Sequence, residues 1–275
     1  MSESWSLRFL YRTLPGRACL KILTLPAVSR AAGVVLSSGL SKWFIPHFIR
    51  KNRIDLRNIE IPREGFCSFN EFFTRKRRTE PEAAGGALIS PCDGFLSVVK
   101  LADGTFFDIK HTRFSLMDLL EDKKLAEKFE GGTAFIFRLT PANYHRYCYA
   151  ADARVVRCRK ISGVLHCVRP IATRTVPVYA QNSREYQVLK TDRFGTVVQM
   201  EIGALLVGKI RNLAQLTEGN RVGAGTQKGY FEFGGSTVVL LLKKDAVRFR
   251  KRLYARMNGD GEMPVRMGEE IAHKI

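Results

Sequence analysis

The sequence feature that most constrains this chain is a pair of glycines followed by two hydroxyl residues and an apolar run. Gly234 and Gly235 precede Ser236 and Thr237, and residues 238–242 read Val-Val-Leu-Leu-Leu. Glycine adopts backbone conformations that other residues resist, and such an apolar run is typical of a buried strand. The pattern predicts a turn that enters a core strand. It also places a hydroxyl nucleophile beside the preceding peptide bond, so self-cleavage is a second interpretation.

Length and charge narrow the classes of protein that the chain can be. Its 275 residues suffice for one large domain, or for a core with an accessory region. Lys and Arg outnumber Asp and Glu by 45 to 26. This excess predicts an anionic partner, which could be nucleic acid, acidic lipid or an acidic substrate. The six cysteines form no CxxC pair, so we expect reduced thiols rather than a zinc site or a disulfide framework.

Residues 1–80 are expected to form a helical, basic region that faces a membrane. Aromatic and aliphatic residues lie beside cations, as in Trp43-Phe44-Ile45 followed by Arg50-Lys51. This composition is typical of helices that bury an apolar face in a membrane interface while their cations meet anionic headgroups. The alternative is that the helices pack on the core and carry solvated charges. No apolar run reaches the roughly 20 residues of a membrane span, and no signal-peptide pattern is found.

Residues 81–275 are expected to form a β-rich core, which makes the fold class α+β. Short apolar segments recur between Gly, Pro and Asn turns, as in sheet proteins. The expected strands are 87–89, 95–101, 133–139, 153–159, 174–180, 185–190, 196–202 and 205–210. Capping patterns at Ser68 and Ser115 predict two helix starts, and the second helix is expected to run to about Phe129.

Four side chains could together carry out acyl-transfer chemistry. Ser236 would be the nucleophile, His145 or His166 the base, and Asp93 the carboxylate that orients the base. The simpler alternative is that Asp93 caps its own turn and that both histidines are structural. The sequence contains no metal-binding constellation and no glycine-rich nucleotide loop, so neither a metal nor a nucleotide is expected.

Five segments, taken together, make the chain resemble the phosphatidylserine decarboxylase proenzyme family. They are Phe72-Phe73-Thr74-Arg75, Ser90-Pro91-Cys92-Asp93-Gly94, Tyr144-His145-Arg146, Gly203-Ala204-Leu205-Leu206-Val207-Gly208 and the run from Gly229 to Thr237. The segments occur in the family's order between about residues 70 and 245. Each is weak alone, but the combination with a Gly-Ser-Thr processing sequence is specific.

The resemblance implies that the chain cuts itself between Gly235 and Ser236. Ser236 would attack the Gly235 carbonyl to give an ester, and β-elimination would then break that ester. Hydrolysis of the resulting dehydroalanine would release ammonia and leave a covalent pyruvoyl group at the new N-terminus. The products would be a β chain, 1–235, and an α chain, 236–275, which stay associated because the strand at 238–242 remains in the core.

The same resemblance implies a lyase with residues 81–275 as its catalytic core. The pyruvoyl group would form a Schiff base with phosphatidylserine and accept electrons as carbon dioxide leaves, giving phosphatidylethanolamine. Phe72, Phe73 and Arg75 are expected at the lipid end of the site. The basic surface suits phosphatidylserine in an anionic membrane. We therefore expect a peripheral protein on the cytoplasmic face of the cell membrane, and a homodimer is an open alternative to a monomer.

Three departures from the family pattern leave the base for self-cleavage open between His145 and His166. Many members have a second histidine where this chain has Cys148, and often an aspartate where it has Asn143. A Lys-Gly-x-Glu segment is replaced by residues 224–227, Ala-Gly-Thr-Gln. A family member that has lost processing is therefore one alternative.

Two other functions also stay open. One is a pyruvoyl enzyme that decarboxylates a soluble amino acid, and the other is a non-enzymatic basic protein that binds a membrane or nucleic acid. The aromatic residues are not arranged for stacking on bases, so nucleic acid is not an expected partner.

Overall fold

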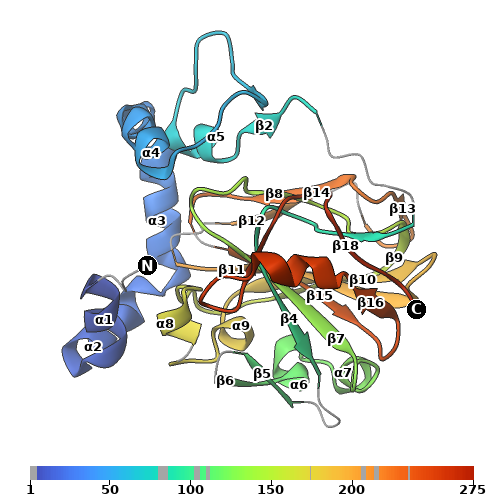
Figure 1. Cartoon of the computed structure of the whole chain (residues 1–275). Helices are drawn as coiled ribbons and strands as arrows, with labels where there is room; N and C mark the ends of the chain where they lie inside the picture. The colour runs from blue at the N-terminus through green and yellow to red at the C-terminus, as the bar shows by residue number, and fades with distance from the viewer. Residues whose placement is uncertain are drawn as a thin grey trace.

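The computed structural model describes residues 5–79, 86–101, 106–109, 112–173, 175–205, 209–213, 217–234 and 236–275. A helical N-terminal arm lies along one side of a large antiparallel sheet (Figure 1). This mixture confirms the predicted α+β class. The proposed domain boundary at residue 80 and the cleavage-site residue Gly235 lie outside the described residues.

Within the described residues, eight antiparallel strands form the main sheet, in the order β13-β9-β10-β11-β15-β7-β4-β17. Their bounds are β4 (Gly94–Lys100), β7 (Thr133–Leu139), β9 (Ala153–Ile161), β10 (Arg184–Thr191), β11 (Thr196–Gly203), β13 (Arg221–Val222), β15 (Ser236–Leu242) and β17 (Met263–Val265). The strand that follows the glycine pair, β15, is therefore central, as the sequence predicted.

Smaller sheets cover the edges and one face of the main sheet. Their strands are β1 (Ile59–Glu60) with β2 (Lys76–Arg77), β12 (Ile210–Asn212) with β14 (Gln227–Phe231) and β8 (Arg146–Cys148), β16 (Val247–Phe249) with β18 (Glu270–Lys274) and β3 (Leu88–Ile89), and β5 (Phe106–Ile109) with β6 (Thr112–Ser115). In the sheet of β12, β14 and β8, strand β14 ends at Phe231, shortly before the predicted cut between Gly235 and Ser236.

The apolar run of β15 is continuous because both faces of the strand are buried. Val239 and Leu241 belong to the core shared with α6 (Leu116–Leu120) and α9 (Val178–Gln181). Val238 and Leu240 belong to a second core on the opposite face, which includes residues of β8, β14 and β18. Successive side chains of a strand point to opposite faces, so a strand between two cores needs apolar residues at every position.

The N-terminal arm contains the expected helices. They are α1 (Trp5–Arg12), α2 (Leu14–Leu23), α3 (Pro26–Ser37), the 3-10 helix η1 (Gly39–Phe44), α4 (Ile45–Asn52) and α5 (Phe69–Phe73). The arm is not separate from the core, because Tyr11 and Leu20 are buried in the same cluster as Val239. Among the described helices none alone has the length and apolar character of a membrane span, although α2 and α3, bent by 64° at their junction, pass that test as a pair.

Two predicted elements are wrong or differ in detail. The segment 174–180 is not a strand, since α8 (Pro170–Thr173) and α9 occupy this region and Arg174 itself is not described. Ile171 and Val178 are buried in the core, so packing overrides the β-branched composition that suggested a strand. The helix expected up to Phe129 is broken into α6 and α7 (Lys123–Glu127), because Glu121 has a left-handed backbone.

Of the strand expected at 205–210, the described residues show only the end. β12 begins at Ile210, Leu205 lies in a turn, and residues 206–208 are not described.

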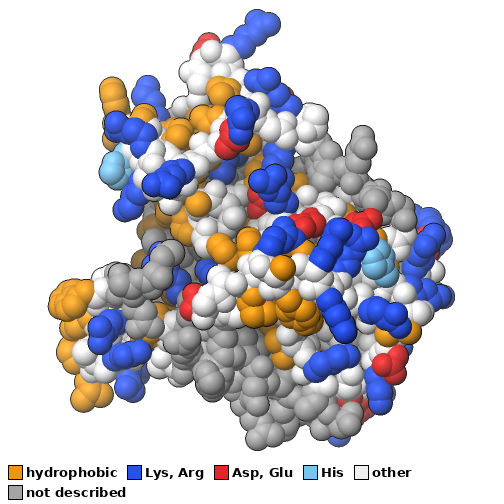
Figure 2. Space-filling view, in the orientation of Figure 1, with side chains coloured by type: hydrophobic (Ala, Val, Ile, Leu, Met, Phe, Trp, Pro, Cys, Tyr) orange, Lys and Arg blue, Asp and Glu red, His pale blue; other side chains and the backbone are white. Residues whose placement is uncertain are grey.

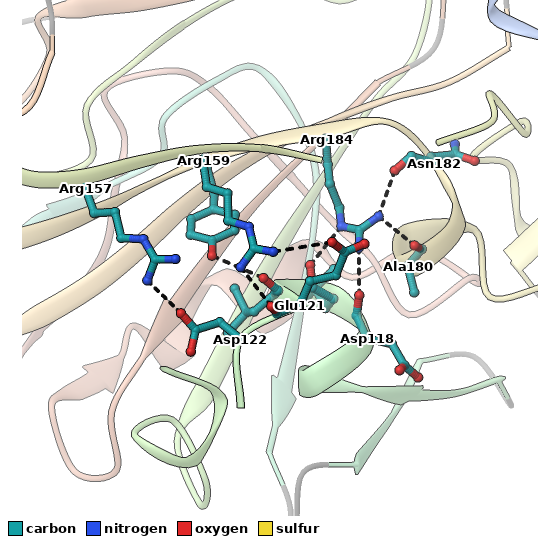
Figure 3. Close-up of polar contacts among 11 residues, drawn as sticks. Asp118, Glu121, Asp122, Arg157, Arg159, Ala180, Asn182 and Arg184 are labelled. Carbon is teal, nitrogen blue, oxygen red and sulfur yellow. Dashed lines mark hydrogen bonds and ion pairs between the residues drawn. The ribbon is translucent and has the colours of Figure 1, made fainter. Parts of the chain in front are cut away.

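Arg184 of β10 anchors the short helices to the sheet (Figure 3). Its guanidinium donates to the carbonyls of Leu119 at 2.8 Å, Asp118 at 2.6 Å and Ala180 at 2.6 Å. The last carbonyls of a helix have no partner within the helix, so this buried cation satisfies acceptors of both α6 and α9. The helices cover the face of the sheet that holds Val239.

Candidate active site

Ser236 is the first residue of β15 and pairs with Gly203 of β11 and Leu139 of β7. The side chain is fully buried, and its Oγ has no hydrogen-bond partner among the described residues. A buried hydroxyl without a partner costs stability, so it is unusual unless the group has a chemical role. Gly203 leaves room here, because it adds no side chain beside the serine.

The backbone before Ser236 turns sharply. Gly234 has a φ of +139°, in a region that residues with a side chain adopt only under strain. The prediction of a glycine turn that enters a core strand is therefore confirmed. The second glycine, Gly235, lies outside the described residues.

His145 lies in the chain just before β8 and is completely buried. Its Nδ1 lies 2.9 Å from the carbonyl oxygen of Asn143. A carbonyl can only accept, so Nδ1 carries the proton and Nε2 of the neutral ring carries the lone pair. Nε2 is buried without a hydrogen-bond partner among the described residues.

The surroundings keep His145 neutral. Burial, and next the positive charge of Arg75, lower the pKa of His145 to about 3, while the backbone of Asn143 and of Gly234 act in the opposite direction. The backbone effect of Gly234 links the ring to the chain one residue before Gly235, where the cut is predicted. The imidazole is therefore neutral at pH 7 and its Nε2 lone pair is not protonated, although a pKa this low makes the ring a weak base.

An aromatic cluster holds His145 and the processing segment together. The ring of Phe73 lies 4.0 Å from that of His145, measured between centroids, and 5.0 Å from that of Phe233. Phe233 also packs on Phe69, and its N–H donates to Asn70 Oδ1 at 3.2 Å. The helix α5 thus fixes both the histidine and the chain two residues before the scissile bond.

No described hydrogen bond or ion pair joins Asp93 to either histidine. Its Oδ2 accepts from Arg77 Nη2 at 2.6 Å, and its Oδ1 accepts from the Met267 N–H at 2.9 Å. The structure thus gives Asp93 two partners outside the expected triad. Its catalytic role stays a prediction.

His166 lies near the same end of the sheet and is half-buried. Its carbonyl accepts from the Leu205 N–H at 3.2 Å, and its ring lies 6.1 Å from that of Tyr11. Burial lowers the pKa of His166, and its Nδ1 has no hydrogen-bond partner among the described residues. Like His145 it has an unpartnered ring nitrogen, but no described hydrogen bond joins it to the processing segment.

The residues predicted at the lipid end of the site are packed closely. Phe72 and Phe73 are fully buried in the aromatic cluster. Arg75 is 4% exposed, lies over the Phe72 ring at 5.0 Å, and donates to the Asn143 carbonyl at 3.3 Å. Arg75 lines a cleft of about 800 Å³. Their contact with substrate stays a prediction.

Sequence reasoning missed a buried ion pair close to this site. Lys228 of β14 pairs with Glu201 of β11, and neither side chain is exposed. Lys228 also donates to Asn212 Oδ1 at 3.0 Å. The only signal in the sequence was a lysine directly before the glycine of the Gly229–Thr237 motif.

Cys148 stands where many relatives are expected to have a histidine, and it is buried. Its N–H donates to the Pro91 carbonyl at 2.8 Å, which places it beside the turn that contains Cys92. Burial raises the pKa of the Cys92 thiol well above its usual value. The Cys92 thiol is therefore protonated at neutral pH and is not a candidate for the base.

Comparisons with known proteins agree on one family. The family model described as Phosphatidylserine decarboxylase matches residues 69–273. Phosphatidylserine decarboxylase proenzyme 2 of Clostridium acetobutylicum is 38% identical over 275 residues, covering 98% of this chain and 92% of the relative. The corresponding proenzyme of Ruminiclostridium cellulolyticum is 37% identical, covering 98% and 91%. That of Chlamydia caviae is 34% identical, covering 98% and 92%.

Proposed function

Because this chain belongs to the phosphatidylserine decarboxylase family, we propose that it cuts itself after Gly235 and makes a covalent pyruvoyl group from Ser236. It is an enzyme that converts phosphatidylserine to phosphatidylethanolamine and carbon dioxide. The two alternatives, a decarboxylase of a soluble amino acid and a non-enzymatic binding protein, have no support from the relatives.

One observation carries the proposal for Ser236. Its hydroxyl is buried at the start of an anchored strand, two residues after the bend at Gly234, and has no hydrogen-bond partner among the described residues. The backbone of Gly234 in turn acts on the pKa of the neutral His145 ring. These are the parts that self-cleavage needs: a nucleophile free of competing hydrogen bonds, a constrained peptide and a base.

In the proposed reaction, Nε2 of His145 takes the hydroxyl proton of Ser236 as Oγ attacks the Gly235 carbonyl carbon. The bond between that carbon and the Ser236 nitrogen breaks, the nitrogen is protonated, and an ester joins the two residues. Loss of the Ser236 Cα proton then breaks the Cβ–O bond and frees Gly235 as a carboxylate. Water hydrolyses the resulting enamine and ammonia departs, so atoms and charge balance.

The described contacts explain how two chains would stay together after the cut. β15 would open the α chain while keeping its ladders to β11 and β7 of the β chain. Arg138 of β7 forms two hydrogen bonds to Glu262, at 2.6 and 3.0 Å, and this largely buried ion pair also spans the two chains. When formed, the pyruvoyl group would supply an electron sink for the bonding pair left on the substrate's Cα as the carboxylate departs as carbon dioxide.

Peripheral attachment to the membrane through the helical arm is also proposed. Large apolar side chains are exposed along it, and Figure 2 shows hydrophobic side chains gathered there among cations. They include Trp5, Leu14, Ile22, Val34, Val35, Leu40, Trp43 and Phe44. Such a surface fits the boundary between acyl chains and anionic headgroups. The cytoplasmic face is proposed because none of the six cysteines, all within the described residues, forms a disulfide.

Release of carbon dioxide from phosphatidylserine vesicles labelled at the serine carboxyl tests the catalytic proposal. The purified protein should release label, and the Ser236→Ala variant should release none. Release by Ser236→Ala at the normal rate would show that Ser236 is not the source of the reactive group.

Vesicle sedimentation tests the attachment. Replacing Leu40, Trp43 and Phe44 together by Gln should reduce pelleting with phosphatidylserine-containing vesicles. Replacing Val156 and Met257, which are exposed apolar residues outside the arm, should leave it unchanged. Equal pelleting of both variants would show that the helical arm is not the site of membrane attachment.

A further inference from the structure

A cleft of about 800 Å³ lies between the helical arm and the core, and cations dominate its lining. Its walls come from the segment joining α4 to β1, from β2, from the turn before β4 and from the loop after β17. Five arginines line it, namely Arg53, Arg57, Arg75, Arg77 and Arg266. A concave surface of this size is suited to a small polar ligand.

The carboxylates of the cleft do not balance these cations. Asp55 pairs with Arg57 at 2.7 Å, and Asp93 pairs with Arg77 at 2.6 Å. The guanidinium groups of the other three arginines, Arg53, Arg75 and Arg266, form no close ion pair with a carboxylate among the described residues. Asp55 acts on Arg266, and Asp93 on Arg75, only through longer-range electrostatics. The cleft therefore has a formal surplus of positive charge, which concentrates anions.

Arg75 is the clearest sign that a ligand is required. It is 4% exposed, yet its only described hydrogen bonds go to backbone carbonyls, and its Nε is buried without a partner. Desolvation of an uncompensated cation is costly, and an anion with several acceptor oxygens offsets that cost. Guanidinium groups match phosphate oxygens through paired N–H donors, so phosphate suits three arginines better than a single carboxylate does.

We infer that this cleft binds a phosphate group through Arg53, Arg75 and Arg266. The phosphodiester of a phospholipid headgroup is the source that fits its position. Tyr144, which lines the cleft, directly precedes His145, and α4 leads from the exposed apolar residues of η1 to Arg53. This choice of source rests on the proposed function, whereas the phosphate site itself does not.

Binding should be measured on full-length Ser236→Ala protein, in which turnover cannot consume the ligand. Isothermal titration at low salt with inorganic phosphate and with glycerophosphoserine should show saturable binding. Arg53→Gln combined with Arg266→Gln should weaken both by about ten-fold or more, because two charged donors are lost from exposed positions. Buried Arg75 is left intact so that the fold is preserved.

The matched control is Lys190→Gln with Lys244→Gln, which removes the same charge at the opposite end of the sheet. It should leave both affinities unchanged. Equal affinity of the arginine variant and its parent, or equal loss in the lysine control, would overturn the phosphate site.

Comparison of inorganic phosphate with glycerophosphoserine shows whether the bound phosphate belongs to a phospholipid headgroup or is free phosphate. Tighter, competitive binding of glycerophosphoserine, with a raised KM of the processed arginine variant on phosphatidylserine vesicles, assigns the site to the headgroup. Equal affinity for inorganic phosphate and glycerophosphoserine, with an unchanged KM of the processed arginine variant, would support the phosphate site but assign it to free phosphate. An uncut, inactive wild-type protein that still binds phosphate would refute the proposed function and leave this inference standing.

Discussion

At the level of single residues, we propose His145 rather than His166 as the base that acts on Ser236. Its Nδ1 is bound to the Asn143 carbonyl, its Nε2 is unpartnered, and the backbone of Gly234 influences its ring. We therefore expect His145→Ala to remain a single chain, and His166→Ala to be cut as the wild type is. Denaturing electrophoresis at successive times after synthesis measures both.

The opposite pattern would make His166 the base, and normal cleavage of both variants would exclude a histidine base altogether. Ser236→Ala serves as the uncut reference. Partial cleavage of His145→Ala that imidazole in the buffer accelerates would also support the assignment, since an added base would replace the missing ring.

The lowered pKa of His145 predicts a particular loss of stability in acid. The free side chain titrates near 6.5 and the folded one near 3, so between these values the unfolded state binds more protons. The contribution of neutral His145 to the free energy of unfolding is fully present above pH 6.5, and it is lost as the pH falls toward 3. The loss between pH 7 and pH 5 should be about 2 kcal/mol.

Urea unfolding of Ser236→Ala, with and without His145→Gln, measures this loss because all other titrating groups cancel in the difference. The protein with His145 should lose more stability on acidification than the protein with Gln. Parallel stability curves would mean that His145 titrates normally in the folded state.

Sequence reasoning located Ser236 and its glycine turn because that signal is local. A φ of +139° at Gly234 and an apolar strand after it depend on neighbouring residues alone. The partners of Asp93 could not be found this way. Arg77 and the Met267 N–H are brought to it by β2 and by the loop after β17, which are far away in the chain.

At the level of secondary-structure elements, the long strands were predictable and the short helices were not. Strands β7 and β15 carry nearly continuous apolar runs, so their pattern predicts a buried strand without knowledge of the tertiary contacts. Strands β10 and β11 also contain polar residues such as Gln187 and Glu201, but keep apolar residues at several positions. The segment 174–180 has a composition typical of a strand, but the core selects helix α9 there. Buried helices of one turn leave too little periodicity to detect.

Arg184 supports these short helices, and its loss should be costly. Replacing it by Leu leaves several buried carbonyls without a donor, so we expect a decrease of about 3–5 kcal/mol in the free energy of unfolding. Arg157→Leu removes a partly exposed pair with Asp122 (Figure 3) and should cost below about 1 kcal/mol. Urea unfolding in the Ser236→Ala background measures both.

A similar small effect of the two substitutions would show that the helices do not depend on Arg184. The comparison is matched because both residues are arginines that contact the same helical region from neighbouring strands.

At the level of the whole molecule, the fold surrounds the predicted cut with contacts that do not depend on the cut bond. β15 lies between two strands of the other chain, β17 pairs with β4, and β18 pairs with β3. Helix α5 holds Phe233 from the other side of the cut. The two products would therefore separate only on unfolding.

The role of the helical arm could be predicted only in part from the amino-acid sequence. Its amphipathic composition fits both a membrane surface and a core contact, and the structure shows both kinds of residue. Tyr11 and Leu20 are buried in the core, whereas Trp43 and Leu40 are exposed. Composition cannot divide one helical segment between these two environments, because the division depends on which face meets the core.

The central claim is that the chain makes its own reactive group from Ser236, and the intact mass of the purified protein tests it most directly. We predict two chains, 1–235 and 236–275, with the shorter one lighter by one ammonia than its sequence requires and blocked to N-terminal sequencing. A single uncut chain with the full mass of 275 residues, in protein that is folded, would contradict the account.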